Sequence, residues 1–314
     1  MNPSYLHRLT LRQIEVFLAI ARQRSYSRAA DELGLTQPAV SAQMRALEAV
    51  ARQPLFDYLG KQLYLTPAGE RLERAAREIR QRLVALEMEL AGLEGQLRGG
   101  LMLAIESGAQ YRLPAALAAF AREHPQIDVR LTVARHGHLL RRLQDNLDDL
   151  TLMTQVPADA GLAFTPVAEH RLVAVGWPGH PLAGRPLPLH EFLGETVLLR
   201  EEESGTRRAF EAFCRRESCV LAPRHLFGSN ETIRRAVQAR MGVAVLPEEL
   251  VQEDIAAGRL CALDVRGMPL RHSWCLVHPQ GKHLTPAAIA FRKFLSQSLA
   301  RQDGRGGGAR TGGG

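Results

Sequence analysis

The chain has 314 residues, with 40 Lys and Arg against 33 Asp and Glu, four cysteines and 5% aromatic residues. At this length two domains are expected rather than one, and 46% hydrophobic residues are enough to bury a core. No apolar stretch approaches the roughly 18 residues of a membrane span, and the first residues lack a signal-peptide pattern. Composition therefore excludes a membrane protein and predicts a soluble, cytoplasmic one. Its formal charge of +7 permits nucleic acid as a partner.

The cysteines argue against a metal or disulfide framework. They lack the paired short spacing of a zinc site, and four cannot staple a chain this long. We expect reduced thiols, no metal and no bound cofactor. Arg215 and Arg216 lie beside Cys214 and Cys219 in the sequence and would favour the thiolate form of these cysteines. A redox switch at this pair is therefore an alternative sensing mode. The four are Cys214, Cys219, Cys261 and Cys275.

The first part of the chain predicts two short helices. Residues 10–22 carry apolar side chains at helical spacing, which is typical of an amphipathic helix. Ser27 is the expected cap of a second helix, which buries Ala29 and Ala30 and ends at Gly34.

The third helix separates into two faces. Thr36 is its expected cap, and Pro38 is tolerated in the first turn, where its missing N–H is not needed. A short helix, a tight glycine turn and a helix with an exposed polar stripe predict a helix-turn-helix that reads base edges. The alternative is a solvated face on an ordinary helical pair. The inward side chains are Val40, Met44 and Leu47, and the outward ones are Gln37, Ser41 and Arg45.

Residues 55–65 predict a small β-hairpin whose basic tip would place Lys61 near the DNA backbone. A long helix follows, with Thr66 as cap and Pro67 at its first position. Its apolar residues step by four and three in turn, which predicts a coiled-coil seam and at least a dimer. Gly99 and Gly100 mark the end of this region. The seam comprises Leu72, Ala76, Ile79, Leu83, Leu86, Leu90, Leu93 and Leu97.

These segments resemble a known family. The stretch LTLRQIEVFLAIARQRSYSRAADELGLTQPAVSAQMRALE, followed by PLFDYLGKQLYLTPAGERL, is similar to the winged helix-turn-helix and linker helix of LysR-type transcriptional regulators. The family usually has a basic residue where this chain has Ala42. The resemblance implies binding to double-stranded DNA at an inverted repeat, with RNA polymerase as a candidate contact, and it implies a tetramer. It places DNA contacts at Thr36, Gln37, Pro38, Ser41 and Arg45, with Arg28 and Lys61 near phosphates.

From Leu101 the pattern alternates between short apolar runs and helical periodicities. Such alternation predicts parallel sheets with helices on both faces. The expected strands are 101–105, 129–133, 150–153, 172–175, 197–199 and 243–246, and the expected helices are 113–122, 138–146, 206–216, 230–241 and 286–299.

Three strand-to-helix junctions carry small polar groups, which suits a ligand at the carboxyl ends of parallel strands. They are Glu106-Ser107-Gly108, Glu203-Ser204-Gly205-Thr206-Arg207 and Gly228-Ser229-Asn230. Each taken alone is also explained as a plain helix cap. Arg200 and Arg207 could neutralise a phosphate or carboxylate. The expected effector-binding residues are Ser107, Gly108, Gln110, Arg200, Ser204, Thr206, Arg207, Ser229 and Asn230.

LysR-type effector domains resemble periplasmic binding proteins, with two α/β subdomains, two crossover segments and a ligand between them. The resemblance implies crossovers near 166–168 and 266–269. The expected fold is α+β and multidomain. Its parts are a winged helix-turn-helix at 1–66, a linker helix at 67–98, an effector domain at 99–299 and a disordered, glycine-rich tail at 300–314. Within the effector domain, subdomain I is about 99–167 plus 268–299, and subdomain II is about 168–267.

The segments RLQDNLDDLTLMTQVP, LLREEESGTRRAFEAF, FGSNETIRRAVQARMGVAVLP and SWCLVHPQGKHLTP are similar to the CbbR-like branch, which regulates Calvin-cycle (RuBisCO) operons. That branch implies a phosphorylated metabolite or nicotinamide nucleotide as small-molecule co-inducer. It usually has a hydroxyl residue and a Lys where this chain has Gly108 and Gln110, before Tyr111. The lost cation leaves open a non-phosphorylated acid effector and another pathway.

An enzyme is not expected. Eleven histidines are present, but none sits with a second ligand in a recognised metal spacing, and no Gly-rich phosphate fingerprint follows a strand. The sequence leaves open the operator, the effector, activation against repression, and dimer against tetramer.

Overall fold

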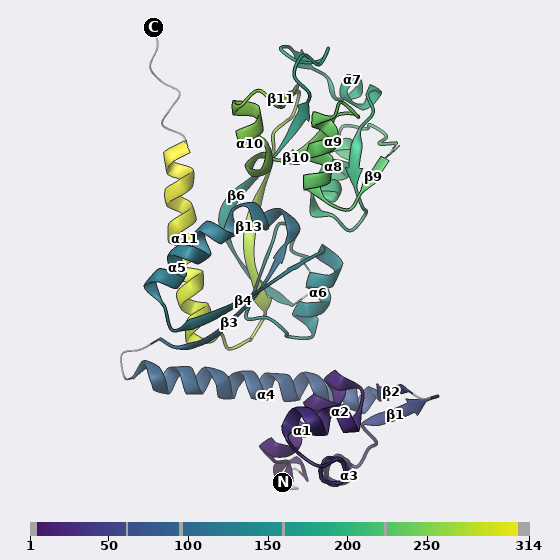
Figure 1. The fold of residues 1–314 in the computed structure, drawn as a ribbon, viewed down its shortest axis with the longest axis vertical. Coiled ribbons are helices and arrows are strands. Elements are labelled where there is room, and N and C mark those ends of the chain that lie inside the picture. The colour runs from purple at the N-terminus through teal and green to yellow at the C-terminus, as the bar shows by residue number, and fades with distance from the viewer. Residues whose placement is uncertain (1–4, 61, 94–96, 159–160, 223–224, 307–314) are drawn as a thin grey trace. The chain divides into compact units, whose positions relative to one another are not determined.

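The computed structural model of the chain describes residues 5–60, 62–93, 97–158, 161–222 and 225–306 (Figure 1). It divides into two compact units, Met1–Glu87 and Met88–Gly314. The fold is mixed α/β, with an N-terminal helical head and a two-part α/β domain. None of the described helices is long and apolar enough to cross a membrane.

Local capping sets the helices of the head. Arg24 ends the first helix in the left-handed conformation, with φ 48°, so the next helix starts immediately afterwards. Ser25, rather than the expected Ser27, therefore caps that helix, and its hydroxyl accepts a hydrogen bond from the Arg28 N–H. The elements are η1 (Tyr5–Arg8), α1 (Leu11–Gln23), α2 (Tyr26–Leu33), α3 (Gln37–Ala51), β1 (Phe56–Leu59), β2 (Gln62–Leu65) and α4 (Pro67–Gly92).

The head has its own apolar core, which fixes the orientation of α3. The three inward residues expected on α3 are buried, together with Phe17 and Ile20 of α1. Each such side chain contributes roughly 1.5–3 kcal/mol of burial free energy. The ring of Phe17 lies 5.4 Å from that of Phe56, so the hairpin is packed onto the same core. The outer face of α3 is thereby left for solvent or a partner.

Strands β1 and β2 form the expected antiparallel hairpin, with Phe56 opposite Leu65 and Leu59 opposite Gln62. Gly60 takes a positive φ of 66° at the turn. Tyr58 and Leu59 are exposed beside it. Lys61, the expected phosphate contact, lies outside the described residues.

Helix α4 bears a shorter apolar stripe than the sequence predicts. Leu72 and Ala76 pack into the head core, because they lie in the turns that contact it. Leu93 follows the last helical residue, and Leu97 packs against the core of the second unit. Neither continues the helical seam. The expected seam residues that stay exposed along the helix, by 37–55%, are Ile79, Leu83, Leu86 and Leu90.

The second unit consists of two lobes joined by two long strands (Figure 1). The first lobe, subdomain I, contains β3 (Gly99–Glu106), η2 (Ser107–Tyr111), α5 (Leu113–Glu123), β4 (Ile127–Ala134), α6 (His136–Gln144), β5 (Leu150–Met153) and α11 (Pro286–Gly306).

The second lobe, subdomain II, follows the first long strand. The sequence pattern predicts β8, α8, α9 and β10 of this lobe but not its other elements. It contains β7 (Pro186–Leu187), α7 (Leu189–Gly194), β8 (Leu198–Arg200), α8 (Gly205–Arg216), β9 (His225–Phe227), α9 (Asn230–Gln238), β10 (Ala244–Pro247), α10 (Glu248–Ala256), β11 (Cys261–Ala262) and β12 (Asp264–Val265).

The main sheet is mixed, so the expectation of parallel sheets is confirmed only for some of its strand pairs. Strand β3 is parallel to β4 and β5, whereas the two long strands, β6 (Leu162–Gly176) and β13 (Leu270–Pro279), run antiparallel to each other. Its strand order is β10-β6-β13-β5-β3-β4, with β11 also paired to β6. The long strands have to be antiparallel because one leaves subdomain I and the other returns to it.

The core residues locate both crossings. On β6, Ala168 belongs to the core of subdomain I and Leu172 to that of subdomain II. On β13, Leu270 still packs in subdomain II, and Trp274 packs in subdomain I. The return therefore falls between Leu270 and Trp274 rather than at 266–269. The breaker-rich segment before Leu270, with a cis Met268–Pro269 bond, precedes the crossing strand instead of forming the crossing.

Both ends of subdomain I differ from expectation. Met88 of α4 joins Leu101 and Leu103 in the subdomain core. Gly99, at φ 130°, fits under it, because an added Cβ would lie 2.5 Å from the Met88 methyl carbon. At the other end α11 continues through Gly306, so residues 300–306 of the expected disordered tail are helical; residues 307–314 lie outside the described part.

Candidate functional site

Helix α3 presents its polar stripe as the sequence predicts. Thr36 caps the helix, with its Oγ1 accepting from the Ala39 N–H at 3.4 Å. The Gln37 amide donates to the Ser41 hydroxyl at 3.0 Å. Thr36, Gln37 and Pro38 are exposed, and Ser41 is half-buried. These groups lie on one face, where a helix can present side chains to a DNA groove.

Two exposed arginines flank this stripe. Arg45 lies two turns along α3 from Gln37. Arg28 of α2 donates from Nη2 to the Gln23 carbonyl at 2.7 Å, so its guanidinium is held against the end of α1. Nearby, burial and the negative field of Glu48 raise the pKa of Tyr26 to about 12, which keeps its hydroxyl protonated. The face thus offers both cations and neutral hydrogen-bonding groups.

The two cations expected to bind an effector are already paired. Arg200 is buried and donates to both carboxylate oxygens of Glu201, at 2.8 and 2.7 Å. Burial alone would raise the pKa of Glu201, but Arg200 holds it below its usual value. Arg207, also buried, donates to Glu211 at 2.6 Å and to the Arg200 carbonyl at 3.1 Å. Both arginines therefore brace the start of α8.

The other polar groups expected in subdomain II differ in whether they are already hydrogen bonded. Ser229 caps α9 and accepts from the Thr232 N–H, as the plain helix-cap alternative predicts. Ser204 precedes α8 and is buried, but its hydroxyl makes no capping hydrogen bond. The Asn230 amide reaches Thr206 only at 3.5 Å, and its Oδ1 has no partner among the described residues. Ser204 and Asn230 thus keep polar atoms available.

The expected residues of subdomain I lie in η2, directly after β3. Ser107 and Gly108 are half-buried, and an added Cβ at Gly108 would lie 3.2 Å from the Trp274 ring. Gln110 is exposed. Tyr111, which follows it, has a buried hydroxyl with no hydrogen-bond partner in the described part of the chain. Burial raises the pKa of Tyr111, so this hydroxyl is a donor.

Glu106 is a buried acid of this region that the sequence pattern does not single out. It ends β3 and is only 4% exposed. Its Oε2 accepts from the Thr154 N–H at 3.1 Å and from the Thr154 hydroxyl at 2.9 Å. Thr154 follows β5, and the carboxyl ends of these adjacent parallel strands meet at one sheet edge.

Two nitrogen atoms lie near the other Glu106 oxygen, Oε1, without forming hydrogen bonds to it. His136 Nδ1 lies 3.5 Å from Oε1, and Arg208 Nη2 lies 3.9 Å from it. All three atoms are buried and lack partners within the described ranges. Arg208 comes from α8 and the other two residues come from subdomain I, so this group spans the junction between the subdomains. No local sequence pattern reveals this group, because its members are 30 to 102 residues apart.

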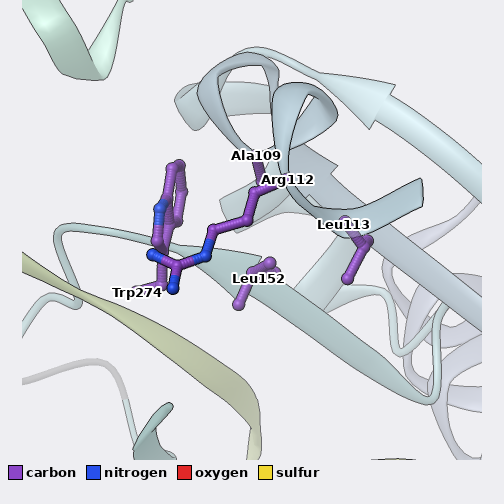
Figure 2. A pocket seen from close by; sticks show the side chains of 5 residues that line it. All are labelled: Ala109, Arg112, Leu113, Leu152 and Trp274. Carbon is purple, nitrogen blue, oxygen red and sulfur yellow. The ribbon is translucent and has the colours of Figure 1, made fainter. Parts of the chain in front are cut away.

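A second cluster lies at the same junction around Trp274. His170 packs on the indole with ring centroids 4.5 Å apart, and its Nδ1 lies 3.6 Å from Glu249. Arg112 lies 3.9 Å from the same carboxylate and points toward Trp274 (Figure 2). A small pocket lies here, lined by Ala109, Arg112, Leu113, Leu152 and Trp274 (Figure 2).

The cysteines do not form a reactive pair. Cys214 is 1% exposed in the core of subdomain II, and burial raises its pKa to about 11. This disfavours the alternative of a thiolate redox switch at Cys214, because desolvation outweighs the effect of the neighbouring Arg215. Among the described residues no group of three or more His, Cys, Asp or Glu could hold a metal ion.

A winged head, an exposed apolar stripe for self-association and a two-lobed α/β unit with unpaired polar atoms at its junction define a ligand-responsive DNA-binding protein. Residues 11–70 match the family model described as bacterial regulatory helix-turn-helix protein, lysR family. Residues 94–300 match the LysR substrate binding domain. The chain belongs to the LysR family of transcriptional regulators.

Two relatives and one solved structure are similar to this chain over nearly all of their own length. The chain is 39% identical to a RuBisCO operon transcriptional regulator of Acidithiobacillus ferrooxidans, over 93% of this chain and 94% of that protein. It is 40% identical to another of the same description from Allochromatium vinosum, over 93% and 97%. Among solved structures, the CcmR regulatory domain of Synechocystis PCC6803 in complex with 2-PG is 31% identical, with TM-score 0.61, and covers 64% of this chain and 98% of that one.

Proposed function

We propose that this regulator controls carbon-fixation genes and that its effector is a small phosphorylated anion bound at the junction of the two subdomains. The observation that carries the effector site is the set of buried, unpartnered polar atoms there, within the described residues, at Glu106, Tyr111, His136, Arg208 and Asn230. Buried polar groups are normally hydrogen bonded, so such a set indicates a site completed by a ligand or water. The relatives support the target genes and the 2-PG complex supports the chemistry.

The junction offers a coherent set of anion-binding groups. Arg208 has buried Nε and Nη2 donors without hydrogen-bond partners in the described part, although Nη2 lies 3.9 Å from Glu106. The start of α8 supplies backbone N–H groups beside the uncapped Ser204 hydroxyl. Tyr111 adds a hydroxyl donor from subdomain I. An anion held by Arg208 and Tyr111 would bridge the two lobes and alter their relative orientation.

DNA binding follows from the head and from self-association. Two heads joined through α4 require a two-fold symmetric operator with half-sites about one helical turn apart or a multiple of it. We place the DNA contacts at the exposed α3 stripe and Arg45, the backbone contacts at Arg28 and Lys61, and the linker at residues 67–98. A change in the orientation of the effector domains would alter head spacing and DNA bending. We further expect a tetramer in the cytoplasm, contact with RNA polymerase and no enzymatic activity.

A second candidate is a non-phosphorylated acid effector. Gln110 stands where the branch usually has Lys and is exposed, so that position brings no charge. In our proposal Arg208 supplies the positive charge that this Lys usually brings. The cysteine alternative is disfavoured by the buried Cys214.

Thermal unfolding of the purified chain with 2-phosphoglycolate, ribulose 1,5-bisphosphate, phosphoenolpyruvate, NADPH, ATP and several aromatic and amino acids tests the effector class. A ligand at a hundred times its dissociation constant stabilises the fold by about 2.7 kcal/mol. We expect a phosphorylated compound to raise the midpoint and Arg208→Met or Ser204→Ala to abolish the rise.

Arg215→Ala is the matched control, since Arg215 is an exposed arginine on the same helix. Its protein should respond like the wild type. A response only to a non-phosphorylated acid would retain the regulator and reject the phosphorylated effector. An undiminished response in Arg208→Met would reject the site.

A further inference from the structure

The start of α8 already has a carboxylate against it, supplied by the other subdomain. An added Cβ at Gly205 would lie 2.4 Å from Glu106 Oε1, so the carboxylate is in close contact with the first helical residue. Only glycine leaves that space. Since helix N-termini favour negative charge, Glu106 lies where an external anion would bind.

Glu106 is also the carboxylate that faces the available arginine. Among the described residues, Glu106 is the acid whose carboxylate lies within 4 Å of the Arg208 guanidinium. The distance from Oε1 to Nη2 is 3.9 Å. Glu203 and Glu211, on the loop before α8 and on α8 itself, also contribute negative field at Arg208. Neither reaches across from subdomain I. Glu106 therefore supplies the cross-subdomain charge at this end of the junction.

The carboxylate is ionised in this position. Burial alone would raise the pKa of Glu106, but His136 and the two donors of Thr154 outweigh burial and hold the pKa below its ordinary value. These contacts leave Oε1 without a hydrogen bond in the described part of the chain. Oε2 is thus hydrogen bonded within its own subdomain, whereas Oε1 faces both His136 of that subdomain, 3.5 Å away, and the start of α8.

We propose that Glu106 is an internal competitor of the effector, holding Arg208 and the start of α8 until an anion takes its place. The inference rests on the proposed function, because it concerns the same site. It makes Glu106 a specificity-determining residue. A dianionic phosphate replaces one carboxylate more readily than a monocarboxylate does, since its attraction to Arg208 is greater. Binding also releases the charge contact that closes the junction at Glu106.

Isothermal titration of the full chain with 2-phosphoglycolate, inorganic phosphate and glycolate tests the competition. Glu106→Gln keeps the side-chain shape and an oxygen for Thr154 but removes the charge. We expect it to bind 2-phosphoglycolate about tenfold more tightly than the wild type, equivalent to about 1.4 kcal/mol. The preference for 2-phosphoglycolate over glycolate should fall. Glu106→Asp, which shortens the reach toward α8, should give a smaller gain.

Asp148→Asn is the matched control. Asp148 is a buried carboxylate of the same subdomain and is bonded to Arg142 at 2.8 and 2.6 Å. Its loss should lower the unfolding midpoint without changing phosphate affinity.

The outcomes separate the two proposals. Equal or weaker binding by both Glu106 variants, with a responsive wild type, overturns the competition and leaves the phosphorylated effector standing. Binding of phosphate by Glu106→Gln but of no phosphorylated probe by the wild type supports the competition and rejects the proposed effector. No response from any variant overturns both.

Discussion

The head and the effector domain use similar residue types in opposite ways. In the head, Gln37 and Arg45 lie exposed on one helix face, ready for an external partner. In the effector domain, Arg200 and Arg207 are buried and spend their donors on Glu201 and Glu211. The groups that we propose for DNA contacts in the head lie close together in the sequence and are exposed on one helix. The effector domain assembles its site from groups that only folding brings together.

Self-association should give the largest effect, because the heads act only in pairs. Leu86→Asp places a charge in the exposed stripe of α4, and we expect complete dissociation of the dimer in sedimentation experiments. Leu93→Asp is the control. Leu93 is 84% exposed beyond the last helical residue and should leave the mass unchanged. An unchanged mass in Leu86→Asp would reject the α4 interface.

Cysteine reactivity distinguishes a metabolite sensor from a redox sensor. With a pKa of about 11, Cys214 should react with iodoacetamide at pH 8 roughly a hundredfold more slowly than a thiol of ordinary pKa. Its burial slows the reaction further. The reaction is slower because a raised thiol pKa lowers the fraction of thiolate at a given pH. Mass spectrometry of native and denatured protein measures the rate, and rapid native labelling of Cys214 would reopen the redox alternative.

Base discrimination tests the head. Arg45→Ala should lower the preference for the cognate operator by about 1–3 kcal/mol while leaving non-specific binding nearly intact, as expected for a base contact. Arg12→Ala is the control, because Arg12 is exposed but pairs with Glu15 on α1. Competition gel shifts with cognate and scrambled DNA measure the ratio. Equal losses on both DNAs would make Arg45 a backbone contact.

The smallest effect is expected at the hairpin tip. Lys61→Ala should weaken binding evenly across sequences and lower the slope of log affinity against log salt by about one. Titration at several salt concentrations measures that slope. A sequence-dependent loss would instead indicate that the hairpin contacts bases.

Local signals in the sequence predicted the head well. Helix periodicity gave α1 and α3, and the burial of Val40, Met44 and Leu47 is confirmed. The error at Ser27 arose because two serines stand two residues apart, and only the left-handed turn at Arg24 selects Ser25. The predicted coiled-coil seam is too long, because leucines at the same spacing can pack against either a partner helix or a tertiary core.

The effector domain was predicted in its parts but not in its assembly. Strand β5 has the expected bounds, yet β13 was missed, and with it the antiparallel pairing and the second crossing. Glu106 cannot be singled out from the sequence, since a lone acid after a strand carries no signal. Its role depends on Arg208, His136 and Gly205, which come from other elements. A glycine at the first position of a helix that faces a buried acid was the one local hint.

The packing of Met88 has a practical consequence for dividing this protein. Met88 belongs to α4 by its backbone and to the core of subdomain I by its side chain, over Gly99. A fragment that starts at Leu93 would lack the Met88 side chain, and Leu101 and Leu103 would be partly exposed to solvent. Loss of a buried methionine costs about 2–5 kcal/mol. An isolated effector domain should therefore begin at least one helical turn before Met88 to retain native stability.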